Sequence, residues 1–232
     1  MNLRIASIFK ERPELLFRHL MFCLSGRPNP IHLWDDDRQF AEIMQEILSH
    51  TLVDVKRCYM IHQFCRQVAS LKGDIAEIGV FKGGTAKLIA QGIGSQDKNI
   101  HLFDTFEGMP SADPRLDIVK KGDFKDTSLE SVKEYLGDLK NIHYYQGFFP
   151  DSAKPVEKLK FSLVHVDVDM HRSVADCCAF FYPRLEAGGI MIFDDYGQLS
   201  CPGAKKAVDE FFSDKKEKPC YLPTGQSVVF RL

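Results

Sequence analysis

The sequence predicts an α/β fold with a doubly wound, mostly parallel sheet. Short apolar runs alternate with stretches in helical spacing between residues 74 and 213, a pattern typical of right-handed crossovers between parallel strands. Acidic doublets end two of the apolar runs, one beginning at Asp167 and the other at Asp194. Ligands bind at the carboxyl ends of the strands in such sheets, so the fold and a carboxylate-lined cleft are predicted together.

Seven strands are expected. Five apolar runs of strand length lie in the alternating region, and two more flank Thr224-Gly225, which indicates an antiparallel C-terminal hairpin. The expected strands cover residues 74–80, 99–105, 142–146, 161–167, 190–193, 220–223 and 228–232.

Helices are expected both before the sheet and between its strands. Apolar spacing from Phe40 to Leu48 and from Tyr59 to Val68 predicts two helices ahead of the first strand. Thr127 and Glu130 have the spacing of a capping box, with Thr127 as the N-cap of a later helix. The other helices are expected over residues 82–91, 173–184 and 203–213.

The chain is expected to divide into a short extension and one large domain. A cluster of helix breakers, Ser25–Pro30, ends an irregular, apolar and basic preface. We interpret residues 1–35 as a helical N-terminal extension that acts as a lid or a dimer contact, with packing as an ordinary core helix as the alternative. Residues 36–232 are then the α/β domain.

Composition excludes several classes of function. A formal charge of −2 gives no electrostatic basis for binding nucleic acid, and no run approaches the ~18 apolar residues of a membrane span. Seven cysteines without a CxxC pair suit reduced thiols. A cytoplasmic protein without a signal peptide is therefore expected.

The turn after the first strand carries glycines that suit a ligand site. Glu77, Gly79 and Gly83 lie where a strand passes into a helix, and such a turn lets backbone approach a ligand beside a helix N-terminus. The spacing is not GxGxxG, so a dinucleotide fits poorly. An ordinary βα turn remains the alternative.

Two later strand ends carry candidate nucleoside contacts. Asp104 ends the second strand, where an acid can hold a ribose diol, although an acid there can also cap a helix. Gly147 and Phe148 follow the third strand. They suit either an adenine slot or core packing.

The acidic doublets point to a divalent metal. Asp167 and Asp169 follow one strand, and Asp194 and Asp195 follow another. Crowded carboxylates are costly unless a cation offsets their repulsion, and hard oxygen ligands with open positions suit Mg²⁺. The alternative is that members of each doublet cap the next helix. His171 is a base, a substrate contact or a bystander.

These segments together resemble the macrocin O-methyltransferase family (TylF/MycF type), Rossmann-like class I methyltransferases that use S-adenosylmethionine and Mg²⁺. The resemblance runs from about Tyr59 to the C-terminus, with Val168 where the family usually has Gly. The matching stretches are Gly73–Thr85, Phe103–Pro110, Gly122–Glu130, Val164–Asp169, Tyr182–Gly189, Phe193–Gly197 and Cys201–Phe211.

The resemblance implies roles for particular residues. The methionine end of S-adenosylmethionine is expected at Glu77, Gly79 and Gly83. Asp169 is the expected general base, with His171 as the alternative. The adenosine is expected at Asp104, Thr105, Phe106, Gly147 and Phe148, and Mg²⁺ at Asp167, Asp194 and Asp195, with Asp167 also beside the cofactor.

The expected activity is O-methylation of a small-molecule hydroxyl, with a vicinal diol such as a sugar or catechol as acceptor. A homo-oligomer, such as a dimer, is the expected assembly, with no nucleic acid or membrane partner. Two alternatives stay open. Asp167-Val168-Asp169 matches the DxD pattern of metal-dependent glycosyltransferases, and the fold also suits a binding module without catalysis.

Overall fold

The computed structural model describes residues 21, 33–94, 97–110, 113–137 and 139–232. The chain separates into two compact units, Met1–Arg38 and Gln39–Leu232. Most of the predicted extension, residues 1–35, lies outside the described residues, and its role as a lid or dimer contact stays a prediction. In the described part of the chain, no helix has the length and apolar character that crossing a membrane requires.

The larger unit is built on a seven-stranded sheet in the order β3-β2-β1-β4-β5-β7-β6. The strands run parallel from β3 to β5, while β7 pairs antiparallel with β5 and β6 antiparallel with β7. The predicted mixed sheet with a C-terminal hairpin is thus confirmed. The strands are β1 (Asp74–Ile78), β2 (Ile100–Asp104), β3 (Ile142–Gln146), β4 (Phe161–Val166), β5 (Leu185–Phe193), β6 (Cys220–Tyr221) and β7 (Ser227–Phe230).

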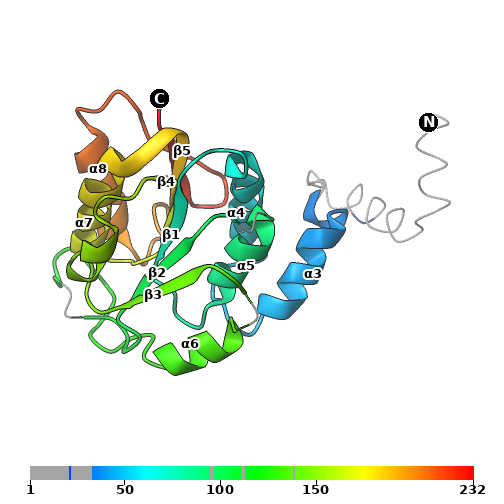
Figure 1. Cartoon of the computed structure of the whole chain (residues 1–232). Coiled ribbons are helices and arrows are strands. Elements are labelled where there is room, and N and C mark those ends of the chain that lie inside the picture. Colours follow the sequence, from blue (N-terminus) through cyan, green and yellow to red (C-terminus); the bar gives the residue numbers. More distant parts are fainter. Residues whose placement is uncertain (1–20, 22–32, 95–96, 111–112, 138) are drawn as a thin grey trace. The chain divides into compact units, whose positions relative to one another are not determined.

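Helices cover both faces of the sheet, with α4 and α5 on one face and α7 and α8 on the other (Figure 1). Strand order reverses between β1 and β4, the neighbours at the centre of the sheet, and a crevice forms at such a point. The described helices are α3 (Arg38–Ile47), α4 (Val55–Val68), α5 (Gly84–Ile93), α6 (Leu129–Tyr135), α7 (His171–Phe181) and α8 (Pro202–Phe212), with 3₁₀ turns η1 (Leu33–Asp35), η2 (Asp151–Val156) and η3 (Tyr182–Arg184).

Capping interactions explain where two of the helices start, in both cases away from the predicted residue. The second helix begins at Val55, because the Asp54 carboxylate accepts the backbone N–H groups of Lys56 and Arg57. The predicted capping box at α6 was wrong by one residue. Ser128 is the N-cap and Ser131 the N3 partner, because the Thr127 hydroxyl instead donates to the carbonyl of Phe81.

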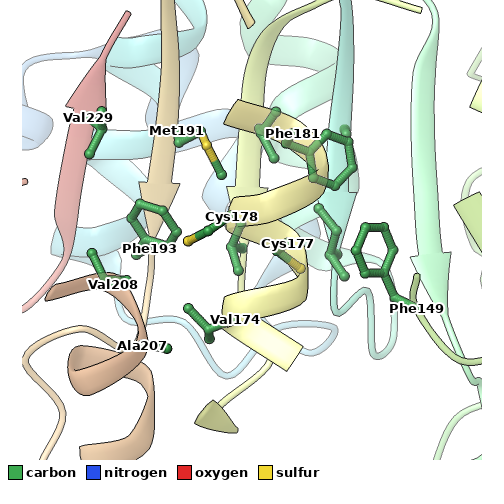
Figure 2. Close-up of a cluster of buried hydrophobic side chains, with 14 of the residues drawn as sticks. Phe149, Val174, Cys177, Cys178, Phe181, Met191, Phe193, Ala207, Val208 and Val229 are labelled. Atoms are coloured by element: carbon green, nitrogen blue, oxygen red, sulfur yellow. The ribbon is translucent and has the colours of Figure 1, made fainter. Parts of the chain in front are cut away.

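The hydrophobic core on the α7/α8 face fixes the strand ends from which the site is built. Figure 2 shows Phe181, Cys177 and Cys178 of α7 over the sheet and Val208 of α8 beside them. Both cysteines are fully buried, as expected of thiols that act as small apolar groups. Alternation along β1 places Ala76 and Ile78 in this core, so its intervening side chains face α4 and α5.

Candidate active site at the carboxyl ends of the strands

A cavity of about 290 Å³ opens at the carboxyl ends of β1, β2, β3, β4 and β5. The segment before α4 and its first turn, from His50 to Arg57, supplies part of another wall. Asp167 and Asp169 line the cavity at the end of β4, and Asp195 lines it at the end of β5. The central sheet therefore brings three of the four predicted acids to one cleft, while the fully buried Asp194 lies outside its lining.

The turn after β1 needs glycine at position 79 because two strand ends meet there. Gly79 has φ of +87°, and a Cβ atom on it would lie 1.8 Å from the carbonyl oxygen of Asp167. No side chain fits such an approach. Gly79 lines the cavity, whereas Gly83 is the N-cap residue of α5, where an added Cβ would contact Val132 and Tyr135 of α6.

Asp104 holds two loops of the cavity wall in place. Its Oδ2 accepts the backbone N–H groups of Val80 at 2.7 Å and Phe81 at 2.9 Å, and its Oδ1 accepts that of Phe106 at 2.7 Å. The Thr105 hydroxyl also lies 3.5 Å from Oδ1, but its shorter contact is to the carbonyl oxygen of Gly108 at 2.8 Å. Since each carboxylate oxygen has two acceptor positions, the second position on Oδ1 carries only this long contact. Thr105 also lines the cavity.

Glu77 lies behind the cavity wall on the α4/α5 face of the sheet. It is fully buried, and its Oε1 lies 3.0 Å from Nδ1 of His165. Its Oε2 has no hydrogen-bond partner among the described residues. His165 is fully buried, and the structure places it between Glu77 and Asp194.

The acids form two overlapping groups of metal-ligand type. One oxygen each from Asp167, Asp194 and Asp195 lie within 4.8 Å of one another. Asp169, Asp195 and the thiol of Cys201 form the second group under the same limit. Asp195 belongs to both groups. This carboxylate, one of the predicted metal ligands, therefore also lies next to Asp169, the predicted base.

Burial and mutual repulsion perturb the titration of these acids. Burial, and then the charges of Asp194 and Asp195, raise the pKa of Asp167. Burial, and then Asp169 and Asp194, raise the pKa of Asp195 to about 8. A group of acids that resists ionisation in this way is typical of a functional site, where a cation relieves the repulsion.

Asp194 differs from its neighbours because it has cationic partners. Arg57 Nη1 donates to its Oδ2, Gln226 Nε2 donates to its Oδ1 at 2.8 Å, and His165 Nε2 lies 3.5 Å from Oδ1. Burial opposes ionisation, but these partners lower the pKa of Asp194. Burial lowers the pKa of His165, but its contacts with Asp194 and then Glu77 outweigh burial and raise that pKa to about 10.

Sequence reasoning missed Arg57 and Gln226. Arg57 reaches Asp194 from the first turn of α4, and its Nε donates to Asp54 at 2.9 Å. Gln226 arrives from the turn before β7. The local signal for Arg57 was its spacing of three residues from Asp54, a residue type that commonly caps helices. No neighbouring residue in the sequence indicated a role for Gln226.

The two candidate bases occupy different surroundings. Asp169 lines the cavity. His171 does not, because its Nε2 lies 2.9 Å from Oε2 of Glu210 on α8 while its backbone N–H donates to Asp117. Of the two candidates, only Asp169 is thus part of the cavity lining. Of the remaining nucleoside candidates, Gly147 and Phe148 line the cavity and Phe106 is buried beside it.

The sheet order, the antiparallel β7 and the ligand cleft at the strand ends define the class I O-methyltransferase fold. A family model supports the same class, since the macrocin-O-methyltransferase (TylF) model matches residues 32–220. The chain belongs to the macrocin-O-methyltransferase family, as its motifs predicted.

Known relatives methylate oxygen atoms of natural products. The chain is 28% identical to demethyldecarbamoylnovobiocin O-methyltransferase of Streptomyces niveus, over 70% of this chain and 68% of the relative. It is 26% identical to 8-demethyl-8-(2,3-dimethoxy-alpha-L-rhamnosyl)-tetracenomycin-C 4'-O-methyltransferase of Streptomyces olivaceus, over 68% of this chain and 66% of the relative. The solved O-methyltransferase NovP matches with a TM-score of 0.70 and 25% identity, covering 78% of this chain and 82% of that chain.

Proposed function

We propose that the protein transfers a methyl group from S-adenosylmethionine to a hydroxyl of a small molecule, with Mg²⁺ at the acid cluster. The observation that carries the proposal is the meeting of the glycine turn after β1 and the carboxylates after β4 and β5 in one cavity. Family membership supports the methyl transfer.

The acid cluster fits a divalent cation. Asp167, Asp194 and Asp195 are the proposed ligands, and hard oxygen donors of this kind suit Mg²⁺. Within the described residues, the cationic side chains in contact with these ligands are Arg57 and His165, both on Asp194. The carboxylate of Asp167 accepts no hydrogen bond from that part of the chain, so a cation supplies the missing compensation.

The turn after β1 fits the methyl donor. Gly79 keeps backbone at the cavity wall, and the buried Oε2 of Glu77 is an acceptor without a partner among the described residues. We propose Glu77, Gly79 and Gly83 at the methionine end. Asp104 then takes the ribose hydroxyls through Oδ1. Other proposed cofactor contacts are Thr105, Phe106, Gly147, Phe148 and Asp167.

S-adenosylmethionine supplies an electrophilic methyl group, so that the acceptor oxygen bonds to its carbon while the carbon–sulfur bond breaks and leaves its electron pair on sulfur. Mg²⁺ supplies charge that lowers the pKa of an acceptor hydroxyl and fixes its position. Asp169 takes the hydroxyl proton on a carboxylate oxygen, which contributes roughly 10²–10⁴-fold when the geometry is right. The walls of the cavity hold donor and acceptor in line.

The proposed acceptor class is a vicinal diol, as in a sugar, because two adjacent hydroxyls suit a divalent cation with open positions. A homo-oligomer and a cytoplasmic location remain expectations from the sequence alone.

The test combines purified protein, S-adenosylmethionine and Mg²⁺ with 4-nitrophenyl α-L-rhamnoside or catechol, and measures S-adenosylhomocysteine and methylated product by mass spectrometry. We expect product that disappears with EDTA, and a loss of roughly 100-fold or more in Asp195→Asn. Asp214→Asn is the matched control, because its side chain is 76% exposed and lies outside the cavity lining.

Three outcomes would contradict the proposal. Full turnover in EDTA would remove the metal from the mechanism. Selective binding of a nucleotide sugar over S-adenosylmethionine would favour the glycosyltransferase alternative. Calorimetry that detects neither cofactor nor Mg²⁺ binding would favour a module without catalysis.

A further inference from the structure

We infer that Cys201 is a positioning residue for the proposed base: its thiol holds one oxygen of the Asp169 carboxylate and leaves the other for the acceptor proton. This inference rests on the proposed function. Its direct observation is a distance of 3.0 Å between Sγ of Cys201 and Oδ1 of Asp169, with the thiol as donor.

The backbone of Asp169 is fixed independently of its side chain. Asp169 has φ of +55°, in the left-handed region that favours glycine. Its N–H donates to Oδ2 of Asp195 at 3.0 Å. These features set where the side chain starts, but χ1 and χ2 still allow the carboxylate to turn. A separate contact is needed to orient the two oxygens.

Cys201 supplies that contact. Within the described residues, the thiol is the one hydrogen-bond donor to the Asp169 carboxylate. The other oxygen, Oδ2, accepts no hydrogen bond from the described part of the chain, and both residues line the cavity. A base with one oxygen held and one free presents a single, defined acceptor to the substrate hydroxyl.

The position of Cys201 suits this role. It is the N-cap residue of α8 and is 3% exposed, and its N–H donates to the carbonyl of Gln198 at 3.0 Å. Burial, followed by the charges of Asp195 and Asp169, raises the pKa of the Cys201 thiol, so sulfur keeps the proton that it donates. By contrast, Cys177 and Cys178 lie in the apolar core.

Packing is the alternative role for a buried thiol, and two substitutions separate it from hydrogen bonding. Cys201→Val fills the space but has no donor. Cys201→Ser keeps a donor but removes volume and apolar surface. A packing role predicts that Val is tolerated and Ser is not, whereas a positioning role predicts the reverse.

The experiment measures kcat and KM for 4-nitrophenyl α-L-rhamnoside or catechol, whichever the wild type methylates, together with calorimetric binding of S-adenosylhomocysteine. We expect Cys201→Val to lower kcat roughly tenfold through misorientation of the base, with KM and S-adenosylhomocysteine affinity within about twofold of wild type. Cys201→Ser should retain at least half of the wild-type kcat. Cys178→Val, a buried thiol away from the cavity, controls for general effects of removing sulfur.

Wild-type kcat in Cys201→Val, or an equal loss in Cys201→Ser, would overturn the inference. Crystal structures of both variants give a readout that needs no turnover. The Asp169 carboxylate should keep its orientation with serine and turn away with valine, and an unchanged carboxylate with valine would also overturn it. A wild type that methylates neither probe challenges the proposed function, and the two structures still decide the contact.

Discussion

Replacing Arg57 with methionine should destabilise the protein strongly, because it leaves a carboxylate buried without its main cationic partner. The guanidinium is 13% exposed and the Asp194 side chain 0% exposed, so solvent screens their attraction little. Methionine keeps most of the apolar volume of the side chain. The change therefore isolates the charge and its hydrogen bonds.

The structure sets the size of the effect. Removing one partner of a buried ion pair costs about 3–5 kcal/mol. Gln226 and His165 still contact Oδ1 of Asp194, so only Oδ2 loses its donor and the lower end of that range applies. The second pair, between Arg57 and the half-exposed Asp54, adds about 0.5 kcal/mol. We expect a total loss of about 3 kcal/mol.

Urea unfolding at pH 7.5 in EDTA, followed by circular dichroism, measures this loss. Arg172→Met is the matched control, since Arg172 is 82% exposed in its pair with Asp176 and should change the free energy of unfolding by less than about 0.5 kcal/mol. The double variant Arg57→Met/Asp194→Asn removes both charges of this ion pair and should recover at least half of the loss. An Arg57→Met protein within about 1 kcal/mol of wild type would refute the reasoning.

Two further variants test the glycine turn and a second buried acid. Gly79→Ala should cost at least about 3 kcal/mol, because its Cβ would overlap the Asp167 carbonyl oxygen. Gly94→Ala, also at positive φ but with open space around it, should cost only about 1 kcal/mol; equal losses in urea would contradict the steric argument. Hydrogen bonds from Tyr182, then from backbone N–H groups including that of Leu232, and then from Arg231 lower the pKa of Glu217 to about 2. Its stabilisation is therefore complete above its ordinary pKa and is lost as pH falls from about 4.5 through 2. Glu217→Gln should therefore lose about 1.5–3 kcal/mol at pH 7 and show a smaller further loss on acidification; parallel pH curves for variant and wild type would exclude this role.

Local patterns were sufficient to predict the fold and the acids of the cavity. Apolar residues recur with different periods in strands and in helices, so their spacing distinguishes the two kinds of element along the sequence. Asp167, Asp169 and Asp195 follow strands that lie side by side, and parallel strands end at one edge of the sheet. The meeting of these acids is thus a consequence of the order of elements, which the sequence carries.

One error of the sequence reading concerns the start of a helix. The start of α6 was misplaced because Thr127 and Ser128 are both good N-cap residues, and only the carbonyl of Phe81 from another loop decides between them. The sequence also did not show that the pleat of β1 turns the Glu77 side chain toward α4 and α5, where its Oε1 contacts His165.

The sequence by itself determined which residue types end each strand, because periodicity and glycine placement act over a few neighbouring positions. Only the tertiary structure decided which side chains partner these acids. Arg57 and Asp194 are 137 positions apart, and Cys201 and Asp169 are 32 apart. Such pairs depend on how a helix packs against a strand end, and that packing is fixed by the whole core rather than by any local run of residues.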